Sequence, residues 1–208
     1  MVGSLHLPGY LTIPRQATAL VLFAHGSGSS RFSSRNRQVA KSLNGAGLAT
    51  LLFDLLSPDE EAAQGRARVF DIELLAGRLV DAVEWADSEF GNSKMAFGLF
   101  GASTGAAAAL MAAAHLGSRI GAVVSRGGRP DLAGEALARV TAPTLLIVGG
   151  NDHGVVELNQ LALAKLGTSA SLHIVPGATH LFEEPGAMEQ VTFLARDWFV
   201  RFLQPLSG

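Results

Sequence analysis

A serine with a glycine two positions before it and another two positions after it is a candidate nucleophile. Gly101 and Gly105 bracket Ser103 in the stretch FGASTGAAAAL, between an apolar run and an alanine-rich run. A serine on a tight strand-to-helix turn has a strained backbone, so residues two away on either side must be small. The pattern predicts that Ser103 lies on a nucleophile elbow. The alternative is that Ser103 only caps the following helix, because serine is a favoured N-cap residue.

A serine hydroxyl is a poor nucleophile unless a base accepts its proton, so the hypothesis requires a histidine. The chain has six histidines. Three are expected to be structural or solvated: His6, His115 and His173. His25 is expected to order the loop that follows it, and His153 to be an ordinary loop histidine, with a place lining the site as its alternative. His180 follows the last predicted strand, in the loop PGATHLFEEPG before the final helix. The base comes last in the chain order serine, acid, histidine, so we expect His180 to be the base.

A carboxylate is needed to fix the tautomer of the histidine and to stabilise the imidazolium. Asp152 follows the apolar run PTLLIVGG, where the serine-first order places the acid. Asp54 is the rival, because it also follows a predicted strand. It precedes Ser103 in the chain and would break the order. We therefore expect Asp152 to be the acid.

Two backbone N–H groups must stabilise the negative oxygen of the reaction intermediate. One is expected from Thr104, the residue after the nucleophile, and the other from Ser27 in the loop HGSGSSR. The alternative for this glycine-rich loop is phosphate binding. No G-K-[ST] follows it and its spacing does not fit G-x-G-x-x-G, which disfavours a nucleotide site.

These residues need a scaffold that gathers them at one edge. Short apolar runs alternate with longer amphipathic ones, the pattern of a parallel sheet covered by helices on both faces. Six runs are predicted as buried parallel strands: Ala19–Gly26, Leu48–Asp54, Lys94–Gly101, Ile120–Gly128, Ala142–Gly150 and Ala170–Gly177. The fold class is therefore α/β, and ligands bind at the carboxyl ends of such strands.

Helices and a hairpin complete the predicted architecture. The longest predicted helix places Ile72, Leu75, Leu79, Val83 and Ala86 on one face. The last predicted helix does the same with Val191, Leu194, Ala195, Trp198 and Phe202. The opening SLHLPGYLTIP predicts a hairpin turned at Pro8-Gly9, which would add antiparallel strands to one edge.

Composition restricts the function classes. The 208 residues, 48% of them hydrophobic, predict a single domain over residues 1–208. A net charge of -2 gives no basic field for nucleic acid. The absence of cysteine excludes thiolate metal sites and a cysteine nucleophile, and we expect neither a metal nor a cofactor. The chain has no long apolar run, so we expect no membrane partner and a cytoplasmic location.

Two arginines are candidates for substrate binding. Arg31 lies on the loop of Ser27, and Arg126 ends a strand at the same edge. A guanidinium can bind a carboxylate through two parallel hydrogen bonds, which would favour an anionic substrate. The alternative is a structural ion pair of these loop arginines, Arg129 included. The acids considered for it are Asp71, Asp131 and Glu183.

The chain as a whole resembles the dienelactone hydrolase-like branch of the α/β-hydrolase superfamily. The segments that carry the resemblance are LVLFAHGSGSSR, FGASTGAA, AVVSRGGRPDLA, PTLLIVGGND and IVPGATHLFEEPG. The resemblance implies Ser103 as nucleophile, Asp152 as acid, His180 as base and the Ser27 and Thr104 amides as oxyanion donors. It also implies about eight strands, which leave no room for a cap domain. Similar domains are known joined to phosphoribosyltransferase domains.

This chain departs from the namesake enzymes, which use a cysteine nucleophile. Serine members of the branch resemble general carboxylesterases, so the expected partner is a small ester, cleaved through an acyl-enzyme intermediate. Two alternatives stay open: acyl transfer to an acceptor other than water by the same residues, and a ligand-binding domain with a vestigial triad. The oligomeric state stays open as well.

Overall fold

The computed structural model describes residues 1–3, 6–60, 68, 70–90, 95–167 and 169–203. The strands are β1 (Gly9–Thr12), β2 (Ala19–Ala24), β3 (Ala49–Phe53), β4 (Ala96–Ala102), β5 (Ile120–Arg126), β6 (Thr144–Gly149) and β7 (Ala170–Val175). The α-helices are α1 (Ser34–Gly45), α3 (Ile72–Phe90), α4 (Thr104–Leu116), α5 (His153–Lys165) and α6 (Ala187–Phe202). Two 3₁₀ segments are η3 (Gly117–Arg119) and η4 (Pro130–Arg139).

The strands form one sheet in the order β1-β3-β2-β4-β5-β6-β7. Strands β2 to β7 run parallel, and β1 pairs antiparallel with β3. The six predicted parallel strands and the α/β class are confirmed. The predicted start of one strand at Lys94 lies outside the described residues. The expected count of about eight strands is corrected to seven within the described part of the chain.

The N-terminal segment supplies one strand of the sheet instead of the predicted hairpin. Val2 and Leu7 form an isolated antiparallel bridge with each other, and Gly9 already begins β1. The predicted turn at Pro8-Gly9 is therefore wrong, since Leu7 pairs with Val2 and Gly9 pairs with Phe53 of β3. Residues 4 and 5 of the predicted hairpin lie outside the described residues. The antiparallel strand that the sequence predicts at one edge is present as β1.

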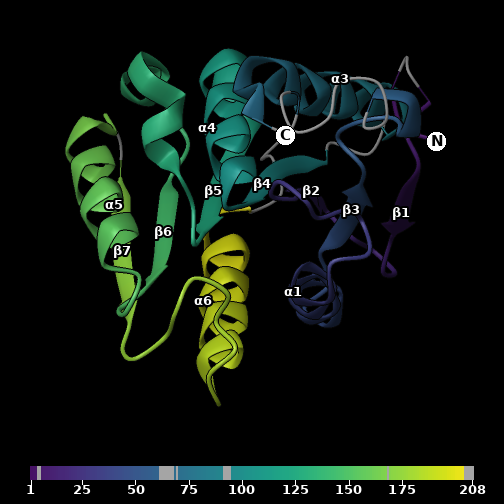
Figure 1. Ribbon diagram of the computed structural model, residues 1–208. Helices are drawn as coiled ribbons and strands as arrows, with labels where there is room; N and C mark the ends of the chain where they lie inside the picture. Colours follow the sequence, from purple (N-terminus) through teal and green to yellow (C-terminus); the bar gives the residue numbers. More distant parts are fainter. Residues whose placement is uncertain (4–5, 61–67, 69, 91–94, 168, 204–208) are drawn as a thin grey trace.

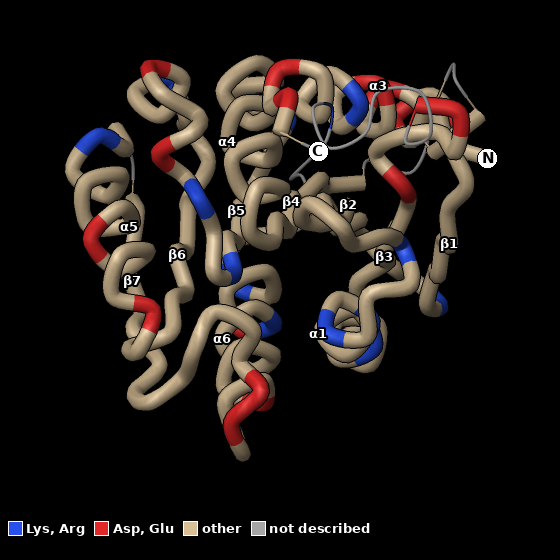
Figure 2. The backbone as a smooth tube through the Cα atoms, in the orientation of Figure 1, with Lys and Arg blue, Asp and Glu red and all other residues tan. Residues whose placement is uncertain are grey.

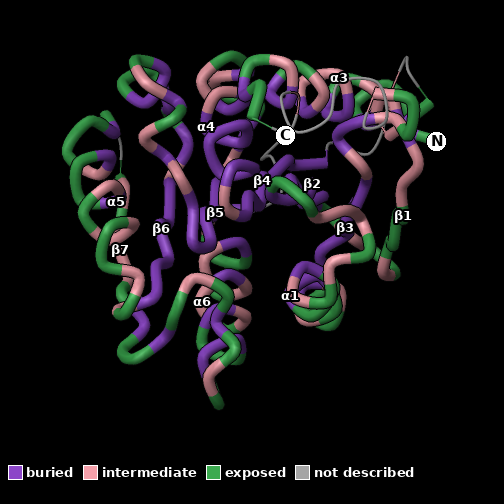
Figure 3. Tube along the Cα trace, viewed as in Figure 1, coloured by how far each residue is buried: buried purple, intermediate pink, exposed green. Residues whose placement is uncertain are grey.

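Helices cover both faces of the sheet. Figure 1 shows α3 and α4 on one face and α1 and α6 on the other. The strands in the middle of the sheet are buried along their length (Figure 3), whereas the edge strand β7 is half-exposed. The predicted apolar face of α3 is buried, and that of α6 is buried or half-buried. Phe199 of α6, which the predicted face leaves out, is fully buried as well.

The order of the strands sets where a site can form. From β2 the chain crosses to β3 on one side, and β4 then lies on the other side of β2. This reversal opens a crevice at the carboxyl ends of neighbouring strands, the usual ligand position in open α/β sheets. The loop after β2 and the residues after β4 meet there. None of the helices in the described part of the chain is long and apolar enough to cross a membrane.

Helix α4 lies at the centre of this arrangement. It carries no Lys, Arg, Asp or Glu (Figure 2), and its four residues Ala106–Ala109 are fully buried. The small alanine side chains allow it to pack between the sheet and the helical segments α3 and η4. A close approach of α4 to the sheet fixes the position of the residue that precedes it, Ser103.

Candidate active site

Ser103 joins β4 to α4 in a conformation that few side chains adopt. Its φ of 52° and ψ of -123° lie outside the regions favoured by L-residues. A Cβ atom on Gly101 would lie 2.4 Å from the Cα of Ala106, and one on Gly105 would lie 2.3 Å from the carbonyl oxygen of Ala24. Neither position can hold a side chain without moving the backbone. The need for small residues two positions from Ser103 is confirmed.

The backbone of Ser103 is fixed from the end of β5. Its N–H donates to the carbonyl oxygen of Arg126 at 3.2 Å, and its carbonyl accepts from the N–H of Arg129 at 3.1 Å. Ser103 occupies the N-cap position of α4, but its side chain makes no capping hydrogen bond. The capping alternative therefore lacks the hydrogen bond that it requires. The residue is half-buried, so the hydroxyl group lies at a partly accessible edge.

His180 and Asp152 come together from the loops after β7 and β6. Nδ1 of His180 lies 2.7 Å from Oδ2 of Asp152. Asp152 is the N-cap residue of α5, yet its side chain makes no capping bond and turns to the imidazole instead. A proton held on Nδ1 leaves Nε2 as the acceptor. Asp54, the rival acid, forms an ion pair with Arg31 instead.

The two loops that carry this pair are bound to each other. The backbone N–H of Asn151 donates to the carbonyl oxygen of Ala178 at 2.9 Å, and its side-chain amide donates to that of Gly177 at 2.9 Å. A Cβ atom on Gly149 would lie 2.4 Å from the carbonyl oxygen of Ala178. These contacts fix the position of the aspartate loop relative to the histidine loop.

Glu184 fixes the histidine loop from its other side. The N–H and the hydroxyl of Thr179 donate to the Glu184 carboxylate at 3.1 and 2.6 Å. These hydrogen bonds from Thr179 lower the pKa of Glu184. The sequence analysis did not single out Glu184, and no spacing rule points to it. Its contribution is to hold the residue directly before His180.

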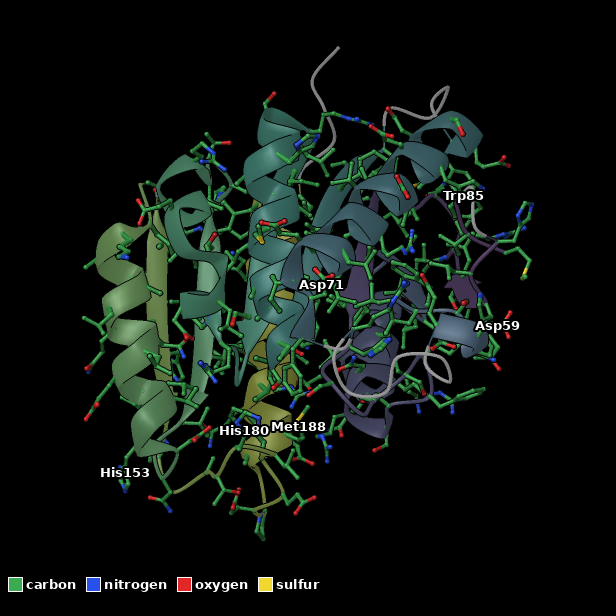
Figure 4. All side chains as sticks on the ribbon, turned by 45° about the horizontal axis from the view of Figure 1, so that its top comes forward. Asp59, Asp71, Trp85, His153, His180 and Met188 are labelled. Atoms are coloured by element: carbon green, nitrogen blue, oxygen red, sulfur yellow. The ribbon has the colours of Figure 1, made fainter. Side chains whose placement is uncertain are left out.

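Two consecutive residues at the end of β5 lie between the serine and the histidine loop. Arg126 accepts the N–H of Ser103, and the next residue, Gly127, has a φ of 52°. A Cβ atom on Gly127 would lie 3.1 Å from the carbonyl oxygen of His180 and 3.7 Å from its ring atom Cε1. Ser103 thus contacts the first of these two consecutive residues, and His180 lies close to the second. His153 lies apart from His180 in Figure 4, at the start of α5.

The two predicted oxyanion donors are neighbours in space. The N–H of Ser27 donates to the Thr104 hydroxyl oxygen Oγ1 at 3.0 Å. A Cβ atom on Gly26 would lie 2.9 Å from the Cβ of Ser103, so the loop after β2 packs directly on the serine. The sequence analysis did not anticipate the bond between Ser27 and the Thr104 side chain.

His25 orders this loop, as the sequence analysis predicts. Its Nδ1 lies 3.0 Å from the carbonyl oxygen of Gly26, and its Nε2 accepts the N–H of Leu55 at 3.1 Å. A neutral imidazole with its proton on Nδ1 satisfies both contacts. His25 therefore links the loop after β2 to the end of β3.

The three arginines near this edge have different surroundings. Arg31 pairs with Asp54, an acid that the sequence analysis did not consider for this role, and lies over the ring of Phe32. Arg129 forms the predicted kind of structural pair, with both oxygens of Asp131. These hydrogen bonds raise the pKa of Arg129.

Arg126 differs from both because it is buried and pairs with no acid in the part of the chain that the structure describes. Only 5% of the residue is exposed, and the one side-chain hydrogen bond that it makes among the described residues runs from Nη2 to the Asn36 side-chain oxygen at 3.3 Å. Its Nε is enclosed and has no partner among the described residues. Burial, together with the nearby charge of Arg35, lowers the pKa of Arg126 to about 10. The guanidinium is thus a buried cation, on a residue whose backbone carbonyl accepts the N–H of Ser103.

Comparisons with known proteins agree on the family. The profile of a family described as an alpha/beta hydrolase domain matches residues 17–193. The crystal structure of a dienelactone hydrolase from Anabaena variabilis has a TM-score of 0.94 and 55% sequence identity, covering 98% of this chain and 95% of the other. Est1E from Butyrivibrio proteoclasticus, solved with ferulic acid, has a TM-score of 0.78 at 18% identity, covering 94% and 95%. This second match shows the fold alone.

One curated relative carries the name of another class of enzyme. A protein of Mycobacterium tuberculosis H37Rv, provisionally named a phosphoribosyl transferase, is 58% identical to this chain over 203 residues. The match covers 98% of this chain but 45% of the relative. The chain spans about half the length of this relative, so the relative's name describes a longer protein.

Proposed function

Because this chain belongs to the dienelactone hydrolase-like alpha/beta hydrolases, we propose that it is a serine carboxylesterase acting on small esters. The observation that carries the proposal is the 2.7 Å contact between His180 and Asp152, together with the strained backbone of Ser103, which the end of β5 links to the histidine loop. A nucleophile, a base and a residue that orients the base are the three parts that activate a serine hydroxyl.

The proposed reaction has two halves. Oγ of Ser103 attacks the ester carbonyl carbon and gives its proton to Nε2 of His180, while Asp152 stabilises the imidazolium. The carbonyl oxygen becomes negative and is stabilised by donors from Thr104 and the Ser27 loop. The intermediate collapses, and the alcohol leaves with the proton from His180. Water, activated by the same histidine, then releases the acid from Ser103.

The surroundings of the pair support small, water-soluble esters. The His180 side chain is 39% exposed, so the base faces an open edge rather than a deep tunnel. A long acyl chain gains affinity by burying its surface in an enclosed pocket. An open edge offers less of that gain, and the preferred acyl group is expected to be short.

The surroundings of the two candidate arginines favour a substrate with a negative charge. Arg31 is neutralised by Asp54. Arg126 has no acid partner in the described chain, and its backbone holds Ser103. A buried cation gains most from an added anion, because little solvent screens the pair. The proposal therefore assigns a carboxylate-bearing ester to Arg126, with Arg31 in a structural role.

Hydrolysis of activated esters of increasing acyl length tests the proposal. The native chain is expected to cleave acetyl and butyryl esters faster than octanoyl or longer ones. Ser103→Ala is expected to lose turnover and to keep its circular dichroism spectrum. Equal turnover in the native protein and Ser103→Ala, or no turnover on any ester, would contradict the proposal.

A further inference from the structure

The backbone N–H of Ser27 already donates a hydrogen bond within the protein. Its N–H donates to Oγ1 of Thr104 at 3.0 Å, within the normal range for an N–H···O bond. A backbone N–H has one hydrogen and makes one strong bond. In this conformation the Ser27 amide cannot also donate fully to a substrate oxygen.

The Thr104 hydroxyl carries a proton that no described residue accepts. Its oxygen accepts from Ser27, and no hydrogen bond donated by this hydroxyl is found among the described residues. Thr104 is 4% exposed, so bulk solvent reaches little of it. A buried donor without an acceptor costs free energy, and this one lies on the residue directly after the nucleophile.

The backbone N–H of Thr104 also has no acceptor within its helix. Thr104 is the first residue of α4, and the first N–H groups of a helix have no acceptor within the helix. The positive end of the helix dipole lies at this point and favours negative charge. One residue thus carries two donors beside Ser103, its amide and its hydroxyl.

We infer that the Thr104 hydroxyl is an oxyanion donor in its own right, with the Ser27 N–H acting through it. In acylation the carbonyl oxygen takes on negative charge as the bond from Ser103 Oγ forms, and it accepts hydrogen bonds from the Thr104 N–H and O–H. The Ser27 N–H, donating to Oγ1, polarises the hydroxyl and makes it a stronger donor. This inference rests on the proposed function and assigns Thr104 as a catalytic residue.

A direct role for Ser27 makes the opposite prediction. If the Ser27 amide were the true donor, the Thr104 hydroxyl would compete with the substrate for it. Removing the hydroxyl would then free the amide, and turnover would stay level or rise. The sign of the change therefore separates the two accounts.

The test compares Thr104→Val, Thr104→Ala and Thr104→Ser in steady-state ester hydrolysis. Loss of an oxyanion donor lowers kcat by about 10²- to 10³-fold. Thr104→Val and Thr104→Ala are both expected to show this loss with KM nearly unchanged. Thr104→Ser keeps the hydroxyl and is expected to keep most of kcat. Thr50→Val is the matched control, because Thr50 is another buried threonine with a bonded hydroxyl, on the edge-side strand β3.

A transition-state analogue separates a catalytic role from a structural one. A trifluoromethyl ketone forms a charged tetrahedral adduct with a serine, so its affinity reports on oxyanion stabilisation. Its Ki is expected to rise in Thr104→Val by the same factor as kcat/KM falls. Full activity in Thr104→Val and Thr104→Ala, or an unchanged Ki, would overturn the inference. Activity that survives Ser103→Ala would overturn the proposed function instead.

Discussion

Nδ1 of His180 lies 2.7 Å from Oδ2 of Asp152, although 28 positions separate them in the chain. The contact favours the imidazole proton on Nδ1 and leaves Nε2 free to accept a proton, as the proposed mechanism requires. Asp152→Asn is expected to lower kcat by about 10²- to 10⁴-fold, because an amide can hold the wrong tautomer. The measurement is steady-state hydrolysis of an acetyl ester.

Asp54→Asn is the matched control for this prediction. Asp54 also follows a strand at the same edge, but its partner is Arg31. Its substitution is expected to leave kcat within a few-fold of the native value. A larger loss of kcat in Asp54→Asn than in Asp152→Asn would show that the acid is Asp54, directly after β3.

The glycines around the serine predict a stability difference. Gly105→Ala would place Cβ 2.3 Å from the Ala24 carbonyl oxygen, so the loop after β2 must move. Overpacking of this kind costs about 1–3 kcal/mol or more. Gly77→Ala, on an exposed part of α3 with nothing within 4 Å of the new Cβ, is expected to stabilise by about 0.5–1 kcal/mol. Urea unfolding measures both, and equal effects of the two substitutions would contradict the packing argument.

The buried cation predicts a substrate preference. Arg126→Gln is expected to lower kcat/KM on an ester that bears a free carboxylate by about 10- to 100-fold, the value of a charged hydrogen bond. On a matched neutral ester the change is expected to be small. Arg129→Gln is the control, because Arg129 is already paired with Asp131. Equal losses on both esters in Arg126→Gln would point to a structural role.

The same arginine predicts a pH dependence of stability. Burial and Arg35 lower the pKa of Arg126 to about 10, so the folded chain binds this proton less tightly than the unfolded chain. The charged form therefore reduces stability below pH 10, and this cost decreases as the pH rises through 10. Arg126→Met is expected to raise the thermal midpoint at pH 8, with a smaller gain at pH 10.5. A lower midpoint for Arg126→Met at pH 8 would show that the charge is compensated.

The fold and the chain order of the candidate catalytic side chains follow from features that a sequence displays. Buried parallel strands appear as short apolar runs, and the polar residues after Ala102, Gly149 and Val175 must emerge at one edge. The glycines at positions 101 and 105 are also predictable, because backbone contact there forbids any side chain. These predictions depend on local spacing and on the direction of the strands.

Side-chain partners across loops could not be predicted in the same way. The Arg31–Asp54 pair, the bond from Ser27 to Thr104 and the bonds from Thr179 to Glu184 join groups whose orientation depends on the final loop conformation. No periodicity specifies a loop conformation. The predicted turn at Pro8-Gly9 was wrong for a related reason, because Pro8 and Gly9 also suit an entry into an edge strand.

Covalent labelling of Ser103 tests the central claim most directly. The native chain, treated with a sulfonyl fluoride or an organophosphonate, is expected to gain one adduct by intact-protein mass, because an activated serine attacks such reagents. Peptide mapping is expected to place the adduct on Ser103, and Ser103→Ala is expected to gain none. Ser118→Ala is the control, because Ser118 is an exposed serine in η3, and its adduct is expected to be unchanged. A native chain that stays unlabelled, or a Ser103→Ala variant that is labelled as fully as the native chain, would contradict the account.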